Sequence, residues 1–511
     1  MIELPNEIWP LIASFLSVGE LWNIRGLNKP FYHIALDEHY RMVKVDIGRS
    51  PSGEYSHSLL RLCDENVAGR VREIDYCQTS SPQDWRNQSS NKPRNRFLSL
   101  KQRIRGTPPI GTKIVMNAIT NLKNVSSVRI HTFIPLTKYS KEWKPILHAG
   151  LGAHSESTRS LSLVIPFENM SELVPSFITL PRLQSLSISL LLPYSRREGL
   201  EATFSTTVTS TIVPFINRHR LSLHSIDMRL PSSPALDYIP IFGPVDPPNL
   251  DMSLLFKGLH HIPHLASASF SISALTDPNL ISGFLQVHSG TMLHLDISLT
   301  GDITPLIDRI FGLSQLPLVE SFSVDYQNYL KDVIVNNPIT KFMHRNSSSL
   351  TSLKVLGKFH RRAELLDLFS QAADTLVFYS KLRHLTVGVH SLTPEIVDII
   401  SFRLFALEDL HLHVRWFKRR DESTHNEEYE FCLEMNRRTY PDWQLRHLTV
   451  MKTDQRNRKS GVNYCITAMA EALPSLQTFN GVSRSEYLAK APSITTGIDK
   501  HDRLPWDSTR T

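Results

Sequence analysis

A short apolar phrase recurs along most of the chain: an apolar residue, two unspecified positions, an apolar residue, one unspecified position and a further apolar residue. The clearest copies are Leu382-x-x-Leu385-x-Val387, Leu407-x-x-Leu410-x-Leu412 and Leu445-x-x-Leu448-x-Val450. Further copies begin at Val71, Val125, Leu183, Leu223, Met292 and Leu350, and a looser one begins at Leu476. Most successive copies are 25 to 42 residues apart. Alternation of this kind predicts a short half-buried strand in each copy.

Helical segments are predicted between the phrases. Thr393 is a good N-cap, Pro394 suits the first helical position, and Ile396, Ile399 and Ile400 form an apolar stripe. Asn337-Pro338 opens a similar segment. A helix followed by a short strand at a regular period resembles the leucine-rich-repeat proteins, and predicts an α/β solenoid with a concave parallel sheet and convex helices. A generic α/β fold is the alternative.

The first 45 residues have a different pattern. Residues 4–16 read LPNEIWPLIASFL, with apolar residues at i, i+3, i+4, i+7 and i+8 from Ile8. Ser17-Val-Gly19 and Asn28-Lys-Pro30 divide the segment into three short helices. So small a module cannot bury its apolar surface within itself, so part of that surface is expected to need a partner or to pack on the following domain.

This segment resembles an F-box, in particular those of fungal proteins. The resemblance rests on Leu4-Pro5-x-Glu7-Ile8, Ile12, Phe15-Leu16, Glu20-Leu21, Leu27-Asn28-Lys29 and Phe31. It implies docking on the Skp adaptor of an SCF (Skp–cullin–F-box) ubiquitin ligase, and through Skp on a cullin. The adaptor contacts that it implies are Leu4, Pro5, Ile8, Ile12, Phe15, Leu16, Leu21 and Leu27. Pro10 departs from the pattern, because it removes a backbone bond inside the first helix.

The predicted domains follow these patterns. Residues 1–48 are assigned to the F-box, 49–482 to the solenoid and 483–511 to a mobile C-terminal tail. Three insertions interrupt the solenoid: a basic segment at about 82–110, a proline-rich loop at about 231–250 and a charged segment at about 415–443.

Composition places the protein among globular chains. Of its 511 residues 41% are hydrophobic and 21% are charged, which excludes a wholly disordered chain. The four cysteines form no CxxC pair or disulfide framework, no apolar run approaches a membrane span, and the first residues are acidic where a secretory signal is basic. A cytoplasmic or nuclear location is expected.

The net charge of +7 is concentrated in one segment. From Trp85 through Lys141 there are twelve Lys or Arg and no Asp or Glu. This segment suits an acidic or phosphorylated substrate, nucleic acid or a nuclear address, and a solvated loop is the alternative. Its aromatic residues are too few for single-strand stacking, which makes nucleic acid the less favoured partner.

The solenoid also predicts a recognition surface on its last repeats. Residues between the apolar phrase positions face the concave side, so His384, Asp409 and His447 form one column, with His411 and His413 beside it. Earlier strands present serine at such positions: Ser185, Ser187, Ser267, Ser269 and Ser271. The candidate substrate-binding residues are His384, Asp409, His411, His413 and His447. A metal site, a pH-sensitive contact and plain solvated residues are the alternatives, and a three-strand column is too wide for one ion.

No catalytic motif, metal set or cofactor site is predicted. The chain has no glycine-rich phosphate loop, HExxH or GxSxG. The sequence therefore favours a non-catalytic substrate receptor of an SCF-type ubiquitin ligase, which holds a protein substrate on its repeats. The alternative is a repeat scaffold outside any ligase that binds nucleic acid or an acidic partner through the basic insertion.

Overall fold

The computed structural model describes most of the chain, and it divides into two compact units, Met1–Phe270 and Ser271–Thr511. The described residues are 5, 7–47, 59, 61–77, 110–132, 140–174, 178–191, 199–230, 250–301, 307, 309–311, 315–327, 336–369, 379–418, 428–452 and 461–490.

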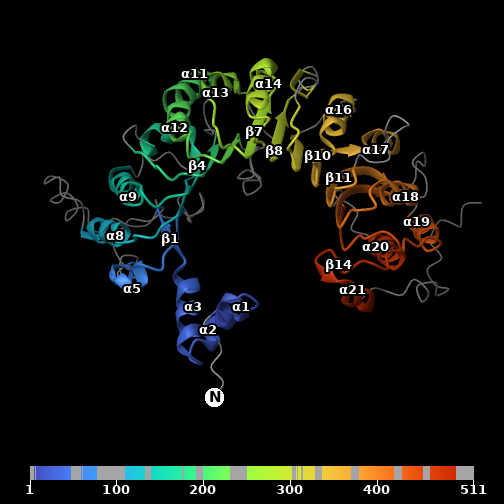
Figure 1. The fold of residues 1–511 in the computed structure, drawn as a ribbon, viewed down its shortest axis with the longest axis horizontal. Coiled ribbons are helices and arrows are strands. Elements are labelled where there is room, and N and C mark those ends of the chain that lie inside the picture. The colour runs from blue at the N-terminus through green and yellow to red at the C-terminus, as the bar shows by residue number, and fades with distance from the viewer. Residues whose placement is uncertain are drawn as a thin grey trace, which may run out of the picture. The chain divides into compact units, whose positions relative to one another are not determined.

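Each unit contains a sheet whose strands follow one another in chain order (Figure 1). The first unit has β1 (Met42–Asp46), β2 (Glu73–Cys77), β3 (Ser127–His131), β4 (Ser160–Pro166), β5 (Ser185–Leu191) and β6 (Ser225–Arg229), and β7 (Ser267–Ser273) spans the boundary. The second unit has β8 (His294–Thr300), β9 (Ser321–Gln327), β10 (Ser352–His360), β11 (His384–Leu392), β12 (Asp409–Phe417), β13 (His447–Lys452), β14 (Thr478–Phe479) and β15 (Val482–Ser483). Neighbouring strands pair in parallel from β1 to β7 and from β8 to β14.

Helices connect the strands and lie along one side of them in each unit (Figure 1). In the first unit these are η1 (Arg61–Cys63), α5 (Glu65–Ala68), α8 (Ile110–Thr120), α9 (Ser140–Ala153), η3 (Phe167–Asn169), α10 (Met170–Leu173), α11 (Leu200–Thr207), η4 (Val208–Ile212), α12 (Val213–His219) and α13 (Ser253–Gly258). In the second they are α14 (Pro278–Val287), α16 (Asn336–Asn346), α17 (Arg362–Phe369), α18 (Pro394–Arg403), α19 (Glu428–Met435), α20 (Gly461–Ala472) and α21 (Arg484–Lys490).

The apolar phrase sets which side of each strand is buried. In β11 Leu385 and Val387 are buried, whereas His384 is exposed and Thr386 is half-buried. Leu382, the first residue of the phrase, is buried in the turn just before the strand. Parallel strands joined by helices, with the apolar residues between the two layers, confirm the predicted α/β fold, which resembles a leucine-rich-repeat solenoid. We call the side of each sheet that the helices leave uncovered its open face.

Helix starts follow the predicted capping pattern with one difference. Thr393 is the N-cap of α18 and Pro394 opens the helix, but the buried Thr393 hydroxyl makes no capping bond. Asp277 caps α14 fully, because its carboxylate accepts a hydrogen bond from the Asn279 backbone N–H. Asn337 and Pro338 lie in the first turn of α16, as predicted.

The long gaps between the predicted phrases contain β4, β7 and β9, which the copies of the phrase named from the sequence do not include. β4 follows Thr158, a buried threonine in the place where the phrase has an apolar residue. β7 and β9 do follow apolar residues at the usual spacing, Leu265 and Val319, and both are buried. The described repeats are therefore more regular than the phrase count implied.

The N-terminal helices are α1 (Ile8–Ala13), α2 (Val18–Ile24) and α3 (Lys29–Tyr40). A capping box between Ser17 and Glu20 fixes the start of α2, and the Asn28 side chain caps α3. The core of this three-helix module is small, with four buried residues: Ala13, Leu21, Phe31 and Ala35. Pro10 lies within α1. The first sheet strand, β1, begins directly after α3, inside the range 1–48 that the sequence assigned to the F-box.

The chain does not become a tail at Ser483, so this prediction was wrong for the residues that follow. Asn480 and Gly481 adopt positive φ values of 47° and 80°, which turn the chain between β14 and the antiparallel β15. Helix α21 then packs on the sheet, with the Tyr487 and Phe479 ring centroids 4.8 Å apart. The rest of the predicted tail, the basic and proline-rich insertions except their last residues, and residues 419–427 lie outside the described residues.

Candidate functional surfaces

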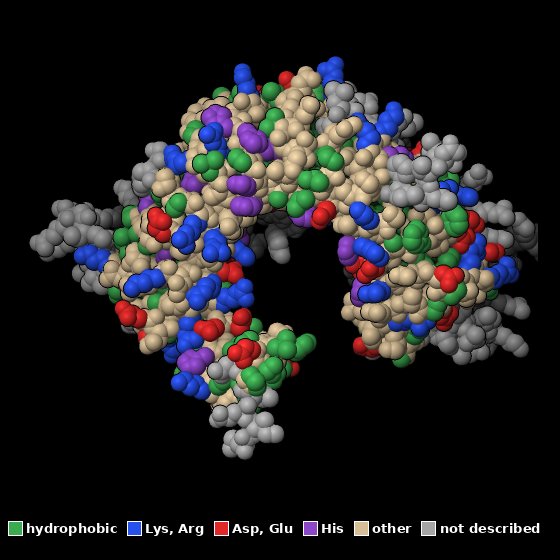
Figure 2. Space-filling model, in the orientation of Figure 1, with side chains coloured by type: hydrophobic (Ala, Val, Ile, Leu, Met, Phe, Trp, Pro, Cys, Tyr) green, Lys and Arg blue, Asp and Glu red, His purple; other side chains and the backbone are tan. Residues whose placement is uncertain are grey.

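Apolar side chains that a folded module usually buries lie in solvent on the N-terminal helices. Phe15 is 82% exposed and Leu27 71% exposed, and Ile8, Leu11 and Val18 are also exposed. The three-helix module has too few residues to cover them, as expected from its size. Green side chains gather over α1 in the space-filling view (Figure 2). We call these five residues the apolar surface of the module.

The structure divides the described residues that were predicted to contact an adaptor into three groups. Pro5, Ile8, Phe15 and Leu27 are exposed, and Ile12 and Leu16 are half-buried against the module's own core. Leu21 is only 3% exposed, so it belongs to the core and not to a contact surface. Its burial follows from its place in α2, which packs on α3. Leu4 lies outside the described residues.

Two exposed residues of the apolar surface were not among the predicted contacts. From the sequence, Leu11 was assigned only to the apolar stripe of the first helix. Val18 lies within Ser17-Val-Gly19, the segment that divides the first two predicted helices. Val18 is the first residue of α2, directly after Ser17, and α1 ends at Ala13, so helical spacing across the two segments could not relate it to Phe15. The fold of the module, more than a periodic pattern, places Val18 in solvent.

In the second unit the predicted column of polar residues forms as expected. His384 pairs with Asp409, and Asp409 pairs with His447, in the register of β11, β12 and β13. The Asp409 carboxylate lies 2.5 Å from His384 Nδ1 and 3.9 Å from His447 Nε2. His447 Nδ1 lies 2.7 Å from the Thr478 hydroxyl on the next strand. The Asp409 carboxylate orients both imidazoles, and the Thr478 hydroxyl occupies the second ring nitrogen of His447.

The members of this column are polar side chains that can form hydrogen bonds. Among the described residues no group of three or more His, Cys, Asp or Glu side chains has a geometry that holds a metal ion. The column also lacks a buried nucleophile, since its members are partly or largely exposed. Hydrogen bonding and charge are therefore what these residues offer.

His411 and His413 lie on the same open face, in the rows next to that column. His411 pairs with Thr386 and Thr449, and His413 pairs with Gly388 and Met451. Partial burial lowers the pKa of His413, and the neighbouring His411 and Lys354 lower it further, while Asp325 opposes them. His413 is therefore neutral around pH 7.

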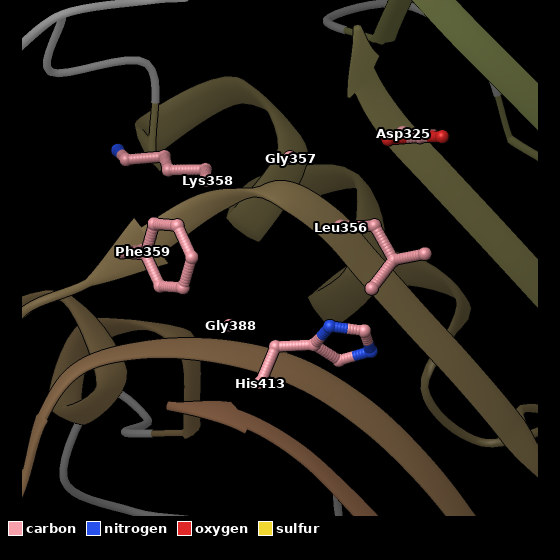
Figure 3. Close-up of a pocket in the computed structure, with 7 residues that line it drawn as sticks. All are labelled: Asp325, Leu356, Gly357, Lys358, Phe359, Gly388 and His413. Atoms are coloured by element: carbon pink, nitrogen blue, oxygen red, sulfur yellow. The ribbon is translucent and has the colours of Figure 1, made fainter. Parts of the chain in front are cut away.

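A cavity of about 270 Å³ opens beside His413 (Figure 3). It did not appear in the sequence analysis, because it depends on an irregularity in β10. The register between β10 and β11 shifts between Val355 and His360. Within this stretch the Lys358 backbone closely approaches Gly388 of β11. The cavity is lined by Asp325, Leu356, Gly357, Lys358, Phe359, Gly388 and His413.

Two glycines allow the irregular stretch to pack so closely. Gly357 has a φ of +74°, and a Cβ there would lie 1.9 Å from the Tyr326 carbonyl oxygen. A Cβ on Gly388 would lie 2.2 Å from the Lys358 carbonyl oxygen. Both contacts are with backbone, which cannot move aside as a side chain does. Gly388, which pairs with His413 in the strand register, lines the cavity, and we call this part of the lining its floor.

The open face of the first unit has different chemistry at the equivalent positions. The first residues of β3 to β7 are all serines in register: Ser127, Ser160, Ser185, Ser225 and Ser267. We call them the serine row. In the second unit the equivalent position in β11 to β13 holds His384, Asp409 and His447.

Comparison with known proteins assigns no family to this chain. No protein-family model matches the chain, and no curated protein is similar enough to count as a relative. The chain is similar to the crystal structure of a leucine-rich-repeat-containing protein from Legionella pneumophila, with 11% identity and a TM-score of 0.32 over 74% of this chain and 95% of that one. A likeness this distant carries no argument about function. In the described residues, no helix has both the length and the apolar content needed to cross a membrane.

Proposed function

We propose that this protein is a substrate receptor of an SCF-type ubiquitin ligase, acting in the cytoplasm or nucleus. Its apolar surface docks on the Skp adaptor, and the open faces of its repeats hold a protein substrate. The observation that carries the proposal is the exposure of Phe15, Leu27 and their neighbours on a three-helix module that continues directly into β1.

The adaptor fits this surface on energetic grounds. Burial of one large apolar side chain contributes roughly 1.5–3 kcal/mol, so burial of the five residues of the apolar surface would offset much of the cost of association. A scattered exposed Leu is ordinary, but five on one small module indicate a binding surface.

The proposed mechanism is proximity without catalysis by this chain. A substrate held on the repeats is kept at a high effective concentration beside the ubiquitin-loaded enzyme that the cullin brings. The protein itself supplies binding groups, and its cullin contact is indirect, through the adaptor.

The proposal is tested by adaptor capture with matched surface variants. Phe15→Asp and Leu27→Asp are expected to reduce Skp binding at least about tenfold each, because a charge replaces a buried apolar contact. Phe402→Asp and Leu221→Asp are the controls, since these residues are 74% and 70% exposed and lie outside the module.

Binding affinity is measured by titration of purified Skp, and circular dichroism checks that every variant is folded. Absence of Skp binding by the unchanged protein would contradict the ligase role. An equal loss in the Phe402 and Leu221 controls would show that the effect comes from charge in general and not from the apolar surface.

The alternative role, a repeat scaffold outside a ligase, depends on the basic insertion at about 82–110, of which only Ile110 is among the described residues. It predicts affinity for nucleic acid that falls steeply with salt and with charge reversal at Arg94, Arg96, Lys101, Arg103 and Arg105. Salt-dependent nucleic-acid binding together with no Skp binding would favour it.

A further inference from the structure

The cavity in the second unit has the size and lining of a subsite for one apolar side chain. Its volume is about 270 Å³, larger than the cavity of about 150 Å³ that holds benzene in a protein core. Leu356 and Phe359 form its apolar walls, and Gly357 and Gly388 expose backbone (Figure 3). A leucine, methionine or phenylalanine side chain is of the right size.

Three residues with titratable side chains line the cavity: Asp325, Lys358 and His413. Lys358 Nζ lies 3.3 Å from Glu364 Oε1, so its charge is already paired. Asp325 pairs with Leu356 in the strand register and also lines the cavity, so its carboxylate disfavours an acidic side chain there. His413 is the polar group beside the floor, and it is neutral because burial lowers its pKa. An uncharged occupant is therefore favoured.

The subsite exists before a ligand arrives. The two glycines bring backbone against backbone at Tyr326 and Lys358, and these contacts hold the irregular stretch of β10 in place. A preformed site loses little conformational entropy on binding, which raises the affinity that a small contact area provides.

One positive charge beside the cavity is available to the ligand. Lys354 precedes Leu356 by two residues on the same face of β10 and is exposed. In the strand register its neighbours are Ser323 and Thr386, which are uncharged. Across the part of the chain that the structure describes, no carboxylate forms an ion pair with Lys354. Residues two apart on a strand are about 6.6 Å apart, a distance that one or two residues of an extended ligand span.

We propose that the cavity binds a single leucine, methionine or phenylalanine side chain of a protein ligand, with an acidic residue one or two positions away that pairs with Lys354. This inference rests on the proposed function only in taking the ligand to be a protein segment held on the open face.

The experiment is selection of random peptides displayed on phage with the full-length protein, followed by affinity measurement on synthetic peptides from the selection. The selected peptides are expected to share a leucine, methionine or phenylalanine next to Asp or Glu. Leu356→Trp fills the cavity and is expected to lower their affinity about tenfold or more, as the loss of one buried apolar side chain predicts.

Two further variants test the size of the cavity and the charge beside it. Leu356→Ala enlarges the cavity and is expected to shift the selected anchor towards tryptophan. Lys354→Glu is expected to exchange the acidic neighbour of the anchor for Lys or Arg. Leu318→Trp and Lys381→Glu are the controls, because both residues are exposed in the same unit and neither lines the cavity.

The outcomes separate this proposal from the ligase role. Peptides that bind Leu356→Trp as well as the unchanged protein, an anchor that is basic, or no enrichment at all would each overturn the subsite. Skp binding is measured on the same variants and is expected to remain. Loss of peptide binding by Leu356→Trp with intact Skp binding supports the subsite. Peptide binding by the unchanged protein without Skp binding leaves the subsite in place and removes the ligase role.

Discussion

The same backbone ladder presents different chemistry in β3 to β7 of the first unit and in β11 to β13 of the second. In the first unit, β3 to β7 begin with the serine row, which offers small uncharged hydroxyls. In the second, β11 to β13 begin with His384, Asp409 and His447, which are linked by contacts between their side chains. The strand spacing and the side of the sheet are the same at these positions, so the difference there lies in side-chain identity.

The backbones of the two units also differ in regularity. The parallel pairs from β1 to β6 run without a shift of register. In the second unit β10 shifts against β11, and a cavity opens there. A repeat sheet therefore acquires a local site through one irregular strand, while its neighbours keep the regular geometry.

The largest expected effect breaks the irregular strand. Gly388→Ala is expected to lower the free energy of unfolding by about 3 kcal/mol, because its Cβ overlaps the Lys358 carbonyl in a closely packed region. Gly152→Ala in α9 of the first unit is the control, since nothing lies within 4 Å of its Cβ. It is expected to raise the free energy of unfolding by about 0.5–1 kcal/mol, as alanine does in a helix.

Both values are obtained from urea unfolding followed by circular dichroism. Equal effects of the two substitutions would show that the close approach at Gly388 does not contribute to stability, and would remove the structural difference between the two sheets.

A second prediction compares one buried histidine in each unit. Burial lowers the pKa of His154 to about 4, and it lowers that of His360 to about 4, where Lys358 acts in the same direction and Glu364 opposes it. Because the unfolded histidines bind protons more readily, stability is full above about pH 6.5 and is lost as the pH falls towards 4. At pH 5 each contributes a loss of about 2 kcal/mol.

The measurement is the free energy of unfolding at pH 7 and pH 5 for the unchanged protein, His154→Leu and His360→Leu. Each variant is expected to lose part of the pH dependence. Glu364→Gln is expected to increase the loss of stability below about pH 4, measured by extending the series to pH 3.5, because the carboxylate lies 3.8 Å from His360 Nδ1 and favours its charged form. A variant whose pH dependence equals that of the unchanged protein would show that its histidine is not protonated differently on unfolding.

The smallest effect concerns the two open faces directly. Asp409→Asn is expected to cost about 1 kcal/mol or less, because its contacts with His384 and His447 are solvent-screened. Ser185→Ala, at the equivalent position of the serine row, is expected to change stability by less than about 0.5 kcal/mol. Thermal unfolding of both variants and of the double variant measures the effects, and a double variant that deviates from their sum would contradict the independence of the two faces.

The fold was largely predictable because the apolar phrase alone determines which side of a strand is buried. The register of His384, Asp409 and His447 followed from that phrase. β4 escaped detection because Thr158 takes the place of the apolar residue, and a buried threonine looks polar in a sequence. The turn after Phe479 was signalled by Asn480-Gly481, a pair typical of hairpins, which the repeat interpretation passed over.

The cavity could not have been predicted, for a physical reason. Gly357 and Gly388 are identified as sites of close backbone approach only once the strand register is known. The burial of Leu21 is similar, since helical spacing gives the stripe to which a residue belongs but not whether its own module or a partner covers it. The role of the predicted recognition residues stays a prediction.

The regular spacing of the strands also limits how many side chains of a peptide ligand can contact the open face. Successive strands of the open face are about 4.8 Å apart, whereas side chains on one side of an extended peptide recur about every 6.6 Å. When a peptide lies across the strands, its side chains coincide with a strand only about once in every four strands. Most strands therefore lie opposite a point between two side chains of the peptide. Recognition of the peptide depends on a few anchor positions instead of one contact per repeat.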